Sequence, residues 1–285
     1  MKNALIFTEY GAQIGLGHLR RCEALKEKLA EAGFSVEIRA NTDPRSCDLA
    51  GVDLGIIDSY LLPIESYEWL ARRTKVALFF DDTLRLDYPS GIVLNGAIGA
   101  ENLPYTPKKG RILWLGARYI LIANAFCSPL SRAIPALPKR LLITLGGSKK
   151  ARKLQESLTQ AICAHYKELE ILQIDPTLDA QGISELMRRA DMALSASGGT
   201  LNELTACAVP TIAVLLAENQ RTLRLGYLEK GAVISADLSD CASIFSALEL
   251  LHSPNERARL SKNMQKIIKE VSWKRHCEMI LELLS

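Results

Sequence analysis

The stretch NALIFTEYGAQIGLGHLRRCEALKEKLAEAG, residues 3–33, decides the fold class of this chain. Residues 3–7 form a short apolar run that predicts a β-strand, and residues 19–33 have the apolar spacing of an α-helix. The turn between them is rich in glycine and carries one histidine, His18, where the helix begins. Because glycine lets the backbone approach a ligand closely, this turn is a candidate binding site.

The composition is that of an ordinary soluble globular protein. The 285 residues are enough for two medium domains, with 48% apolar and 24% charged residues. The net charge of +3 and the lack of a dense basic block give no reason to expect nucleic acid as a partner. The seven cysteines are scattered without a CxxC pair, so we expect neither a zinc site nor a redox motif. No signal peptide and no membrane-spanning run are recognisable, which predicts a cytoplasmic protein with reduced thiols and no membrane partner.

Strand-like and helix-like segments alternate along both halves of the chain. In the first half we expect strands at 34–40, 53–60, 75–83 and 91–96, and a helix at 64–73. The proline-rich stretch 127–138 is the expected linker, after which the alternation restarts with strands at 139–148, 169–175, 191–197 and 210–216. We therefore predict an N-terminal domain, 1–130, and a C-terminal domain, 138–285, whose last helix is free to pack back on the first domain. Each would be a Rossmann-like, doubly wound parallel sheet, and the two would face a cleft.

Ligands of open α/β sheets bind outside the carboxyl ends of the strands, so the candidate site residues are those that follow strands. In the first turn these are Gly15, Gly17 and His18. A helix N-terminus lowers the pKa of a histidine and favours the neutral imidazole that a general base needs. The catalytic interpretation of His18 competes with a structural one, in which the histidine caps or packs the turn.

Carboxylates follow two later strands of the first half. Asp58 ends one strand, and Asp81 and Asp82 end the next. Only one of two consecutive side chains can point into the cleft, where it would orient His18 or bind a sugar hydroxyl. We assign the catalytic role to Asp81 and substrate binding to Asp58 and Asp82. The alternatives are a helix cap, a turn or a magnesium site, and without an identifiable cage of ligands we expect no metal.

The segment SASGGTLNEL, residues 195–204, predicts a phosphate site. A strand ends in small residues, and two glycines open a helix whose backbone amides can hold a diphosphate. We expect the diphosphate on Ser197, Gly198 and Gly199, with the Thr200 hydroxyl as a further donor and the Glu203 carboxylate on the ribose hydroxyls. The structural alternative is a capping box between Thr200 and Glu203.

Five further residues lie at other strand ends and are candidate ligands of the substrate. Asn219 and Gln220 could bind hexose hydroxyls, or they could simply start a helix. Gly147 would give the cleft a flexible turn, or it would only form a tight corner. Tyr60 and Asn95 complete the set.

With these motifs in hand, the chain resembles the UDP-sugar hydrolases of the pseudaminic acid pathway over nearly its whole length. The resemblance rests on QIGLGHLRR, IIDSY, FFDDT, SASGGTLNEL and AENQ. The glycine-rich helix opening is shared with the wider group of GT-B glycosyltransferases. The resemblance implies UDP bound mainly by the C-terminal domain and metal-independent hydrolysis of UDP-2,4-diacetamido-2,4,6-trideoxy-β-L-altropyranose. It also implies that the histidine matching His18 activates water and that no cofactor takes part.

The sequence also departs from the family pattern. Ala123 stands where the family often has an arginine, and Lys149 stands where an acidic residue follows Gly-Gly-Thr. These changes leave three functions open: the hydrolase, acting on this sugar or a related diacetamido sugar; a GT-B glycosyltransferase that uses an acceptor hydroxyl in place of water; and a non-catalytic protein that binds nucleotide sugars. A nicotinamide enzyme is disfavoured because no GxGxxG fingerprint follows the first strand.

Overall fold

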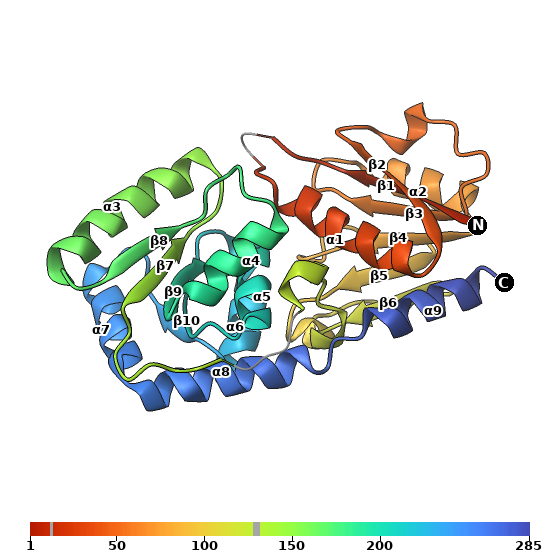
Figure 1. Cartoon of the computed structure of the whole chain (residues 1–285). Helices are drawn as coiled ribbons and strands as arrows, with labels where there is room; N and C mark the ends of the chain where they lie inside the picture. Colours follow the sequence, from red (N-terminus) through yellow and green to blue (C-terminus); the bar gives the residue numbers. More distant parts are fainter. Residues whose placement is uncertain (12–13, 128–131) are drawn as a thin grey trace. The chain divides into compact units, whose positions relative to one another are not determined.

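The structure is a computed structural model that describes residues 1–11, 14–127 and 132–285. It divides into two compact units, each with its own sheet (Figure 1). The first unit comprises Met1–Ala123 together with Val271–Ser285, and the second comprises Asn124–Glu270. The chain thus enters the second unit before the stretch 127–138, of which residues 128–131 lie outside the described residues, and returns to the first unit with its last helix.

The first unit has six parallel strands in the order β2-β1-β3-β4-β5-β6. These strands are β1 (Lys2–Thr8), β2 (Phe34–Ala40), β3 (Leu54–Asp58), β4 (Val76–Phe80), β5 (Gly91–Asn95) and β6 (Arg111–Leu115). The helices are α1 (Gly17–Glu31), α2 (Ile64–Arg73) and α9 (Trp273–Leu283), with short 3₁₀ turns η1 (Pro44–Ser46), η2 (Ala100–Asn102) and η3 (Ala117–Tyr119).

Successive side chains of β1 enter opposite cores of this sheet. Ile6 lies in the core formed with α1 and α9, and Phe7 lies in the core formed with α2. Both side chains are fully buried, and burial of a large apolar side chain contributes roughly 1.5–3 kcal/mol. Both faces of the sheet are therefore covered, as a parallel sheet requires.

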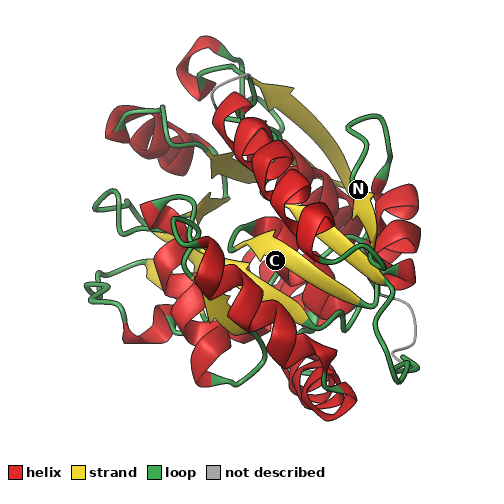
Figure 2. Ribbon diagram, turned by 90° about the vertical axis from the view of Figure 1, so that its left-hand side faces the viewer, coloured by secondary structure: helices red, strands yellow, loops and turns green. Residues whose placement is uncertain are grey.

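The second unit has five parallel strands in the order β11-β10-β9-β7-β8. These strands are β7 (Arg140–Thr144), β8 (Glu170–Gln173), β9 (Met192–Ala196), β10 (Thr211–Val214) and β11 (Ile234–Ala236). The helices are α3 (Lys149–His165), α4 (Ala180–Arg189), α5 (Gly199–Ala206), α6 (Arg221–Glu229), α7 (Cys241–His252) and α8 (Pro254–Ile268), with 3₁₀ turns η4 (Asn124–Phe126) and η5 (Glu218–Gln220). Figure 2 distinguishes the helices, in red, from the strands, in yellow.

Each sheet contains a point where the strand order reverses. In the first unit the chain runs from β1 to β2 on one side and then to β3 on the other side of β1. In the second unit it runs from β7 to β8 and then to β9 on the other side of β7. Such switch points leave a crevice at the carboxyl ends of the two central strands, and ligands of this fold class bind there.

The predicted alternation of strands and helices is confirmed. The strand at 34–40 and the helix at 64–73 have the predicted bounds. Two strands had no prediction, β6 and β11. Most of β6 is only partly buried at the edge of its sheet, and β11 has three residues, too few for a recognisable alternation.

A buried histidine in the first unit gives a pH-dependent stability. His276 on α9 is 5% exposed and packs against the rings of Trp114, Tyr119 and Trp273. Its Nδ1 atom is buried and has no hydrogen-bond partner among the described residues. Burial, with a smaller contribution from the charge of Arg118, lowers the pKa of His276 to about 4.

We expect acidification to destabilise the first unit through His276. The unfolded chain takes up a proton near pH 6.5 and the folded chain only near pH 4, so stability is complete above pH 6.5 and is lost as the pH falls toward 4. At pH 5 the loss is about 2 kcal/mol. His276→Phe should remove this part of the pH dependence, which urea unfolding at pH 7 and pH 5 measures. An equal loss in wild type and variant would contradict the assignment.

Candidate functional site

The backbone of the first turn places His18 at the switch point of the first unit. Gly15 adopts φ +82°, which favours glycine, and exchanges backbone hydrogen bonds with Gly11 at 3.3 and 2.7 Å. Helix α1 then begins at Gly17, and no side chain caps it. Residues 12 and 13 of the predicted turn lie outside the described residues. His18 is the second residue of the helix and is 8% exposed.

His18 and Asp58 form a buried pair. The Nδ1 atom of His18 lies 3.1 Å from Asp58 Oδ1 and 3.3 Å from the Asp58 carbonyl oxygen. Both neighbours are acceptors, so Nδ1 carries the proton in the neutral ring and the lone pair lies on Nε2. The ring of Tyr60 stands edge-on to the imidazole, with 4.5 Å between ring centroids. The pair therefore presents a basic nitrogen in a fixed direction.

The protonation of His18 differs from the sequence-based prediction. Burial lowers its pKa, but the hydrogen bond and the charge of Asp58 together outweigh burial, so the pKa is raised above its ordinary value. The prediction that the helix N-terminus leaves this histidine with a lowered pKa is therefore wrong. A raised pKa makes His18 a stronger base once it is deprotonated.

Arg21 joins two carboxylates of the site and had no role in the sequence-based prediction. It donates to Asp58 from Nε at 2.8 Å and from Nη2 at 2.6 Å. It also donates to Asp82 from Nη1 at 2.8 and 3.1 Å and from Nη2 at 3.1 Å. Arg21 lies three residues after His18 on one helix, and this spacing puts both on the same face. The three-residue spacing between His18 and Arg21 was the feature of the sequence from which Arg21 could have been predicted.

Of the two consecutive carboxylates, Asp82 is the one that joins the group around His18. It accepts from Arg21 and from the hydroxyl of Tyr60. Asp81 is buried and instead accepts from three backbone N–H groups of the following turn and from the Tyr105 hydroxyl at 2.8 Å. These contacts contradict the assignment of Asp81 as the catalytic partner of His18, because its oxygens stabilise the turn.

Asn95 also has a structural environment. Its side chain is fully buried, donates to the Tyr105 hydroxyl at 3.0 Å and accepts from the backbone N–H of Ala97 at 3.0 Å. The prediction of Asn95 as a substrate ligand is therefore corrected, since its hydrogen-bonding groups already serve the loop after β5.

Glu9 is a third buried carboxylate near His18, and sequence reasoning missed it. It accepts from the Ser59 hydroxyl and from the backbone N–H groups of Tyr60 and Leu61, and its Oε1 lies 3.9 Å from His18 Nδ1. Glu9 directly follows β1, so the strand-end rule that selected Asp58 would also have selected it. These bonds hold the loop that carries the Tyr60 ring.

The turn after β9 forms the switch point of the second unit. Helix α5 begins at Gly199 with Gly198 as its N-cap and with no side-chain cap, so the predicted alternative of a capping box is absent here. A side-chain atom on Gly199 would meet nothing within 4 Å. Ser197 is fully buried, and its hydroxyl and its backbone N–H both donate to the Val214 carbonyl, at 2.9 and 3.1 Å, so the predicted diphosphate is left with the amides that follow Ser197. Thr200 is half-buried in the first turn of α5.

Other predicted ligands lie around the same switch point. Gln220 lies beside the turn, because its Nε2 is 3.6 Å from where a side-chain atom of Gly198 would stand. Its Oε1 accepts from the Leu216 backbone N–H at 3.1 Å. Asn219 is exposed, and Glu203 is half-buried one turn into α5. Gly147 lies in the open turn after β7.

Helix α3 begins with Lys149 after that turn. Ser148 caps the helix, its hydroxyl accepting from the Ala151 N–H at 3.2 Å. Lys149, which departs from the family pattern, is exposed. Its charge therefore lies at the loop that follows β7.

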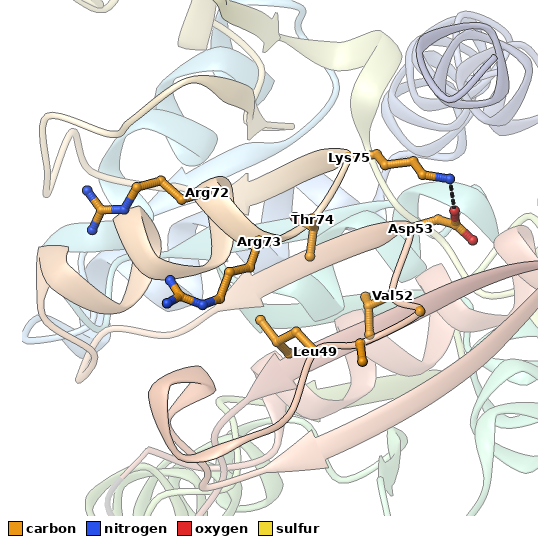
Figure 3. A pocket seen from close by; sticks show the side chains of 9 residues that line it. Leu49, Val52, Asp53, Arg72, Arg73, Thr74 and Lys75 are labelled. Carbon is orange, nitrogen blue, oxygen red and sulfur yellow. Dashed lines mark hydrogen bonds and ion pairs between the residues drawn. The ribbon is translucent and has the colours of Figure 1, made fainter.

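A groove of about 440 Å³ lies at the opposite, amino end of the first sheet (Figure 3). Among its lining residues, Lys75 pairs with Asp53 at 2.7 Å, while Arg72 and Arg73 lie at the end of α2. Because ligands of this fold class bind at the carboxyl edge, we do not assign the reaction to this groove.

No group of three His, Cys, Asp or Glu side chains within the described residues could hold a metal ion. In the same residues, each helix is too short or too polar to cross a membrane.

Two parallel-sheet α/β units, each with a switch point in its strand order, define a class of fold, and solved structures identify it. The chain is similar to MurG of Acinetobacter baumannii, with a TM-score of 0.60 at 12% identity over 99% of this chain and all of that chain. It is also similar to the calicheamicin glycosyltransferase CalG4, with a TM-score of 0.59 at 14% identity over 99% and 98% of the two chains. The protein has the GT-B fold, which confirms the predicted fold class.

Curated relatives are closer in sequence. A pseudaminic acid cytidylyltransferase and UDP-2,4-diacetamido-2,4,6-trideoxy-β-L-altropyranose hydrolase of Helicobacter pylori is 27% identical over 83% of this chain and 48% of the relative. A UDP-N-acetylglucosamine–N-acetylmuramyl-(pentapeptide) pyrophosphoryl-undecaprenol N-acetylglucosamine transferase of Nostoc punctiforme is 25% identical over 78% of this chain and 67% of the relative. The chain thus spans about half the length of the first relative. No protein-family model matches the sequence.

Proposed function

We propose that this protein hydrolyses a UDP-linked diacetamido-trideoxy hexose to UDP and the free sugar, in the formation of a pseudaminic-type acid. The observation that carries the proposal is the pair of His18 and Asp58, which fixes a basic nitrogen at the switch point of the first unit. The relative from Helicobacter pylori, whose name includes this hydrolase activity, supports the choice of reaction.

The second unit holds the nucleotide in this proposal. The first backbone N–H groups of α5 have no side-chain cap, and a helix N-terminus with free amides attracts a diphosphate. Gly198 and Gly199 let the phosphates approach the backbone, and Thr200 adds a hydroxyl. Glu203 takes the ribose hydroxyls, and Asn219 and Gln220 serve the hexose.

The first unit supplies the base. His18 Nε2 removes a proton from water as the water oxygen bonds to the anomeric carbon, and the bond from that carbon to the diphosphate oxygen breaks. UDP leaves with the bonding electrons, and the amides of α5 stabilise its charge. Water attacks opposite the leaving group, so the anomeric centre is inverted. Asp58 orients the imidazole, and Asp82 and Tyr60 bind sugar hydroxyls.

A second candidate is a glycosyltransferase, in which His18 deprotonates an acceptor hydroxyl. It is favoured by the GT-B fold and by the Nostoc relative, which is named as a transferase. A non-catalytic sugar-nucleotide binding protein is the third, on the basis of Ala123 and Lys149.

Release of UDP from UDP-2,4-diacetamido-2,4,6-trideoxy-β-L-altropyranose, with chelator and without acceptor, tests the proposal. Steady release with an inverted product in the NMR spectrum supports the metal-independent hydrolase. Release that requires an added acceptor identifies a transferase. Tight UDP binding without turnover of this sugar or related diacetamido sugars identifies the binding protein.

Gly199→Glu should weaken UDP binding at least about tenfold, about 1.4 kcal/mol. The new carboxylate would stand at the first helical position, where it repels a diphosphate but suits the helix dipole, so the fold is retained. Cys241→Glu is the matched control, since Cys241 is the exposed first residue of α7, which follows β11, a strand that β10 separates from β9. Calorimetric titration with UDP measures both. Equal UDP affinities of the two variants would show that the nucleotide does not bind at the N-terminus of α5.

A further inference from the structure

Arg21 has a position that the proposed reaction leaves unexplained. Its guanidinium lies 4.7 Å from the ring centroid of Phe80 and donates to Asp58 and Asp82 through Nε, Nη1 and Nη2. A planar guanidinium donates in fixed directions, so the two carboxylates hold it from two sides. Because these nitrogens already donate to carboxylate oxygens of the protein, Arg21 holds the side chains of Asp58 and Asp82 in place.

One oxygen atom connects Arg21 to His18. Asp58 Oδ1 accepts from Arg21 Nη2 at 2.6 Å and lies 3.1 Å from His18 Nδ1. Arg21 Nε holds the other oxygen, Oδ2, at 2.8 Å. Two hydrogen bonds from Arg21 thus fix the Asp58 carboxylate. Its Oδ1 atom, which lies next to His18 Nδ1, also interacts with the positive charge of Arg21.

The charges around His18 show how Arg21 affects the protonation of the imidazole. Negative groups come from three different strand ends, and one cation stands among them. The ionisable groups around His18 and its partner Asp58 are Glu9 after β1, Tyr60 after β3, Asp82 after β4, and Arg21 and Cys22 on α1. Without Arg21, the unpaired carboxylates of Asp58 and Asp82 would stabilise a charged imidazolium, which cannot act as a base.

We propose that Arg21 is the positioning residue of this site. It locks Asp58 in the orientation that holds His18 Nδ1, and it neutralises the carboxylates enough for His18 to release its proton at working pH. The inference rests on the proposed role of His18 as the base, but its test does not require turnover.

The test is the titration of His18 in the folded protein, followed by NMR of ¹⁵N-histidine-labelled protein. The signal is assigned by its absence from His18→Ala. Arg21→Gln should raise the pKa of His18 by about one unit or more, because Asp58 and Asp82 lose their cation. Arg21→Lys should raise it less, because one ammonium keeps the charge without reaching both carboxylates.

Lys26→Gln is the matched control, since Lys26 is an exposed cation on the same helix. It should leave the His18 titration unchanged. An unchanged titration in folded Arg21→Gln would overturn the inference, because a purely structural arginine affects only stability.

Asp82→Asn keeps the inference open to contradiction even if both arginine variants fail to fold. Arg21 would then pair with Asp58 alone, so the pKa of His18 should fall, and an unchanged or raised value would overturn the inference. Failure of the proposed hydrolysis would be distinguishable from failure of this inference. In that case the pKa shifts of His18 would still be seen in a protein that turns over no sugar. Turnover by the wild type with no shift in Arg21→Gln would reject only the role of Arg21.

Discussion

His18→Ala is expected to reduce UDP release by about 10²–10⁴-fold, the usual contribution of a positioned general base. Alanine leaves water at the anomeric carbon with no group to take its proton. We propose the nucleotide site in the second unit, so the affinity for UDP should stay within about twofold. Initial rates of UDP release and calorimetric titration with UDP measure the two effects separately.

The pH profile of the wild type gives an independent check on this role. The base must be deprotonated, so kcat should be low at pH values below the raised pKa of His18. It should rise as the pH increases through this pKa. His165→Ala is a suitable control, because His165 is exposed on α3 and stacks on Phe245, outside both switch points. If His18→Ala kept the rate and the pH profile of the wild type, the base would have to be another residue.

The strand-end rule identified most of the group around His18 from the sequence. Asp58 ends β3, Tyr60 follows it and Asp82 follows β4, and parallel strands bring these ends to one edge. Arg21 and Glu9 obey the same geometry, one by helical spacing and the other by following β1. They were predictable in principle, but an arginine on a helix and a glutamate in a turn have many other uses.

The choice between Asp81 and Asp82 could not be made from the sequence. Both follow the last residue of β4, where the strict alternation of a strand no longer applies. The conformation of the following turn determines which carboxylate faces Arg21. Leu84 adopts φ +58°, and the Asp81 carboxylate accepts from the N–H groups of this turn. Asp82 is then left to face Arg21.

Ser197 illustrates a second limit. Its hydroxyl is used by the Val214 carbonyl at the end of the neighbouring strand β10. This contact depends on the pairing of β9 with β10, which no local pattern specifies. The glycines beside it were easier to predict, because a helix opened by glycine has the same free amides in any sheet order.

Asp58→Asn should lower kcat by about 10²–10⁴-fold, close to the effect of removing His18 itself, although the imidazole remains. An amide has the shape of the carboxylate but no charge, so the bond that fixes the proton on Nδ1 is weakened and Nε2 is no longer held as the base. The substrate affinity should change little, because the proposed site of the uridine and phosphates lies in the second unit.

The same variant should move the pH profile in the opposite direction to Arg21→Gln. Asp58 is the group that raises the pKa of His18 against burial, so its neutralisation lets burial dominate and the pKa falls. The residual activity should therefore reach its plateau at lower pH than in the wild type. Leu62→Ala, a half-buried residue of the same loop, controls for local loosening. A slow variant with an unshifted profile would show that Asp58 only supports the loop, and the catalytic pair would have to be abandoned.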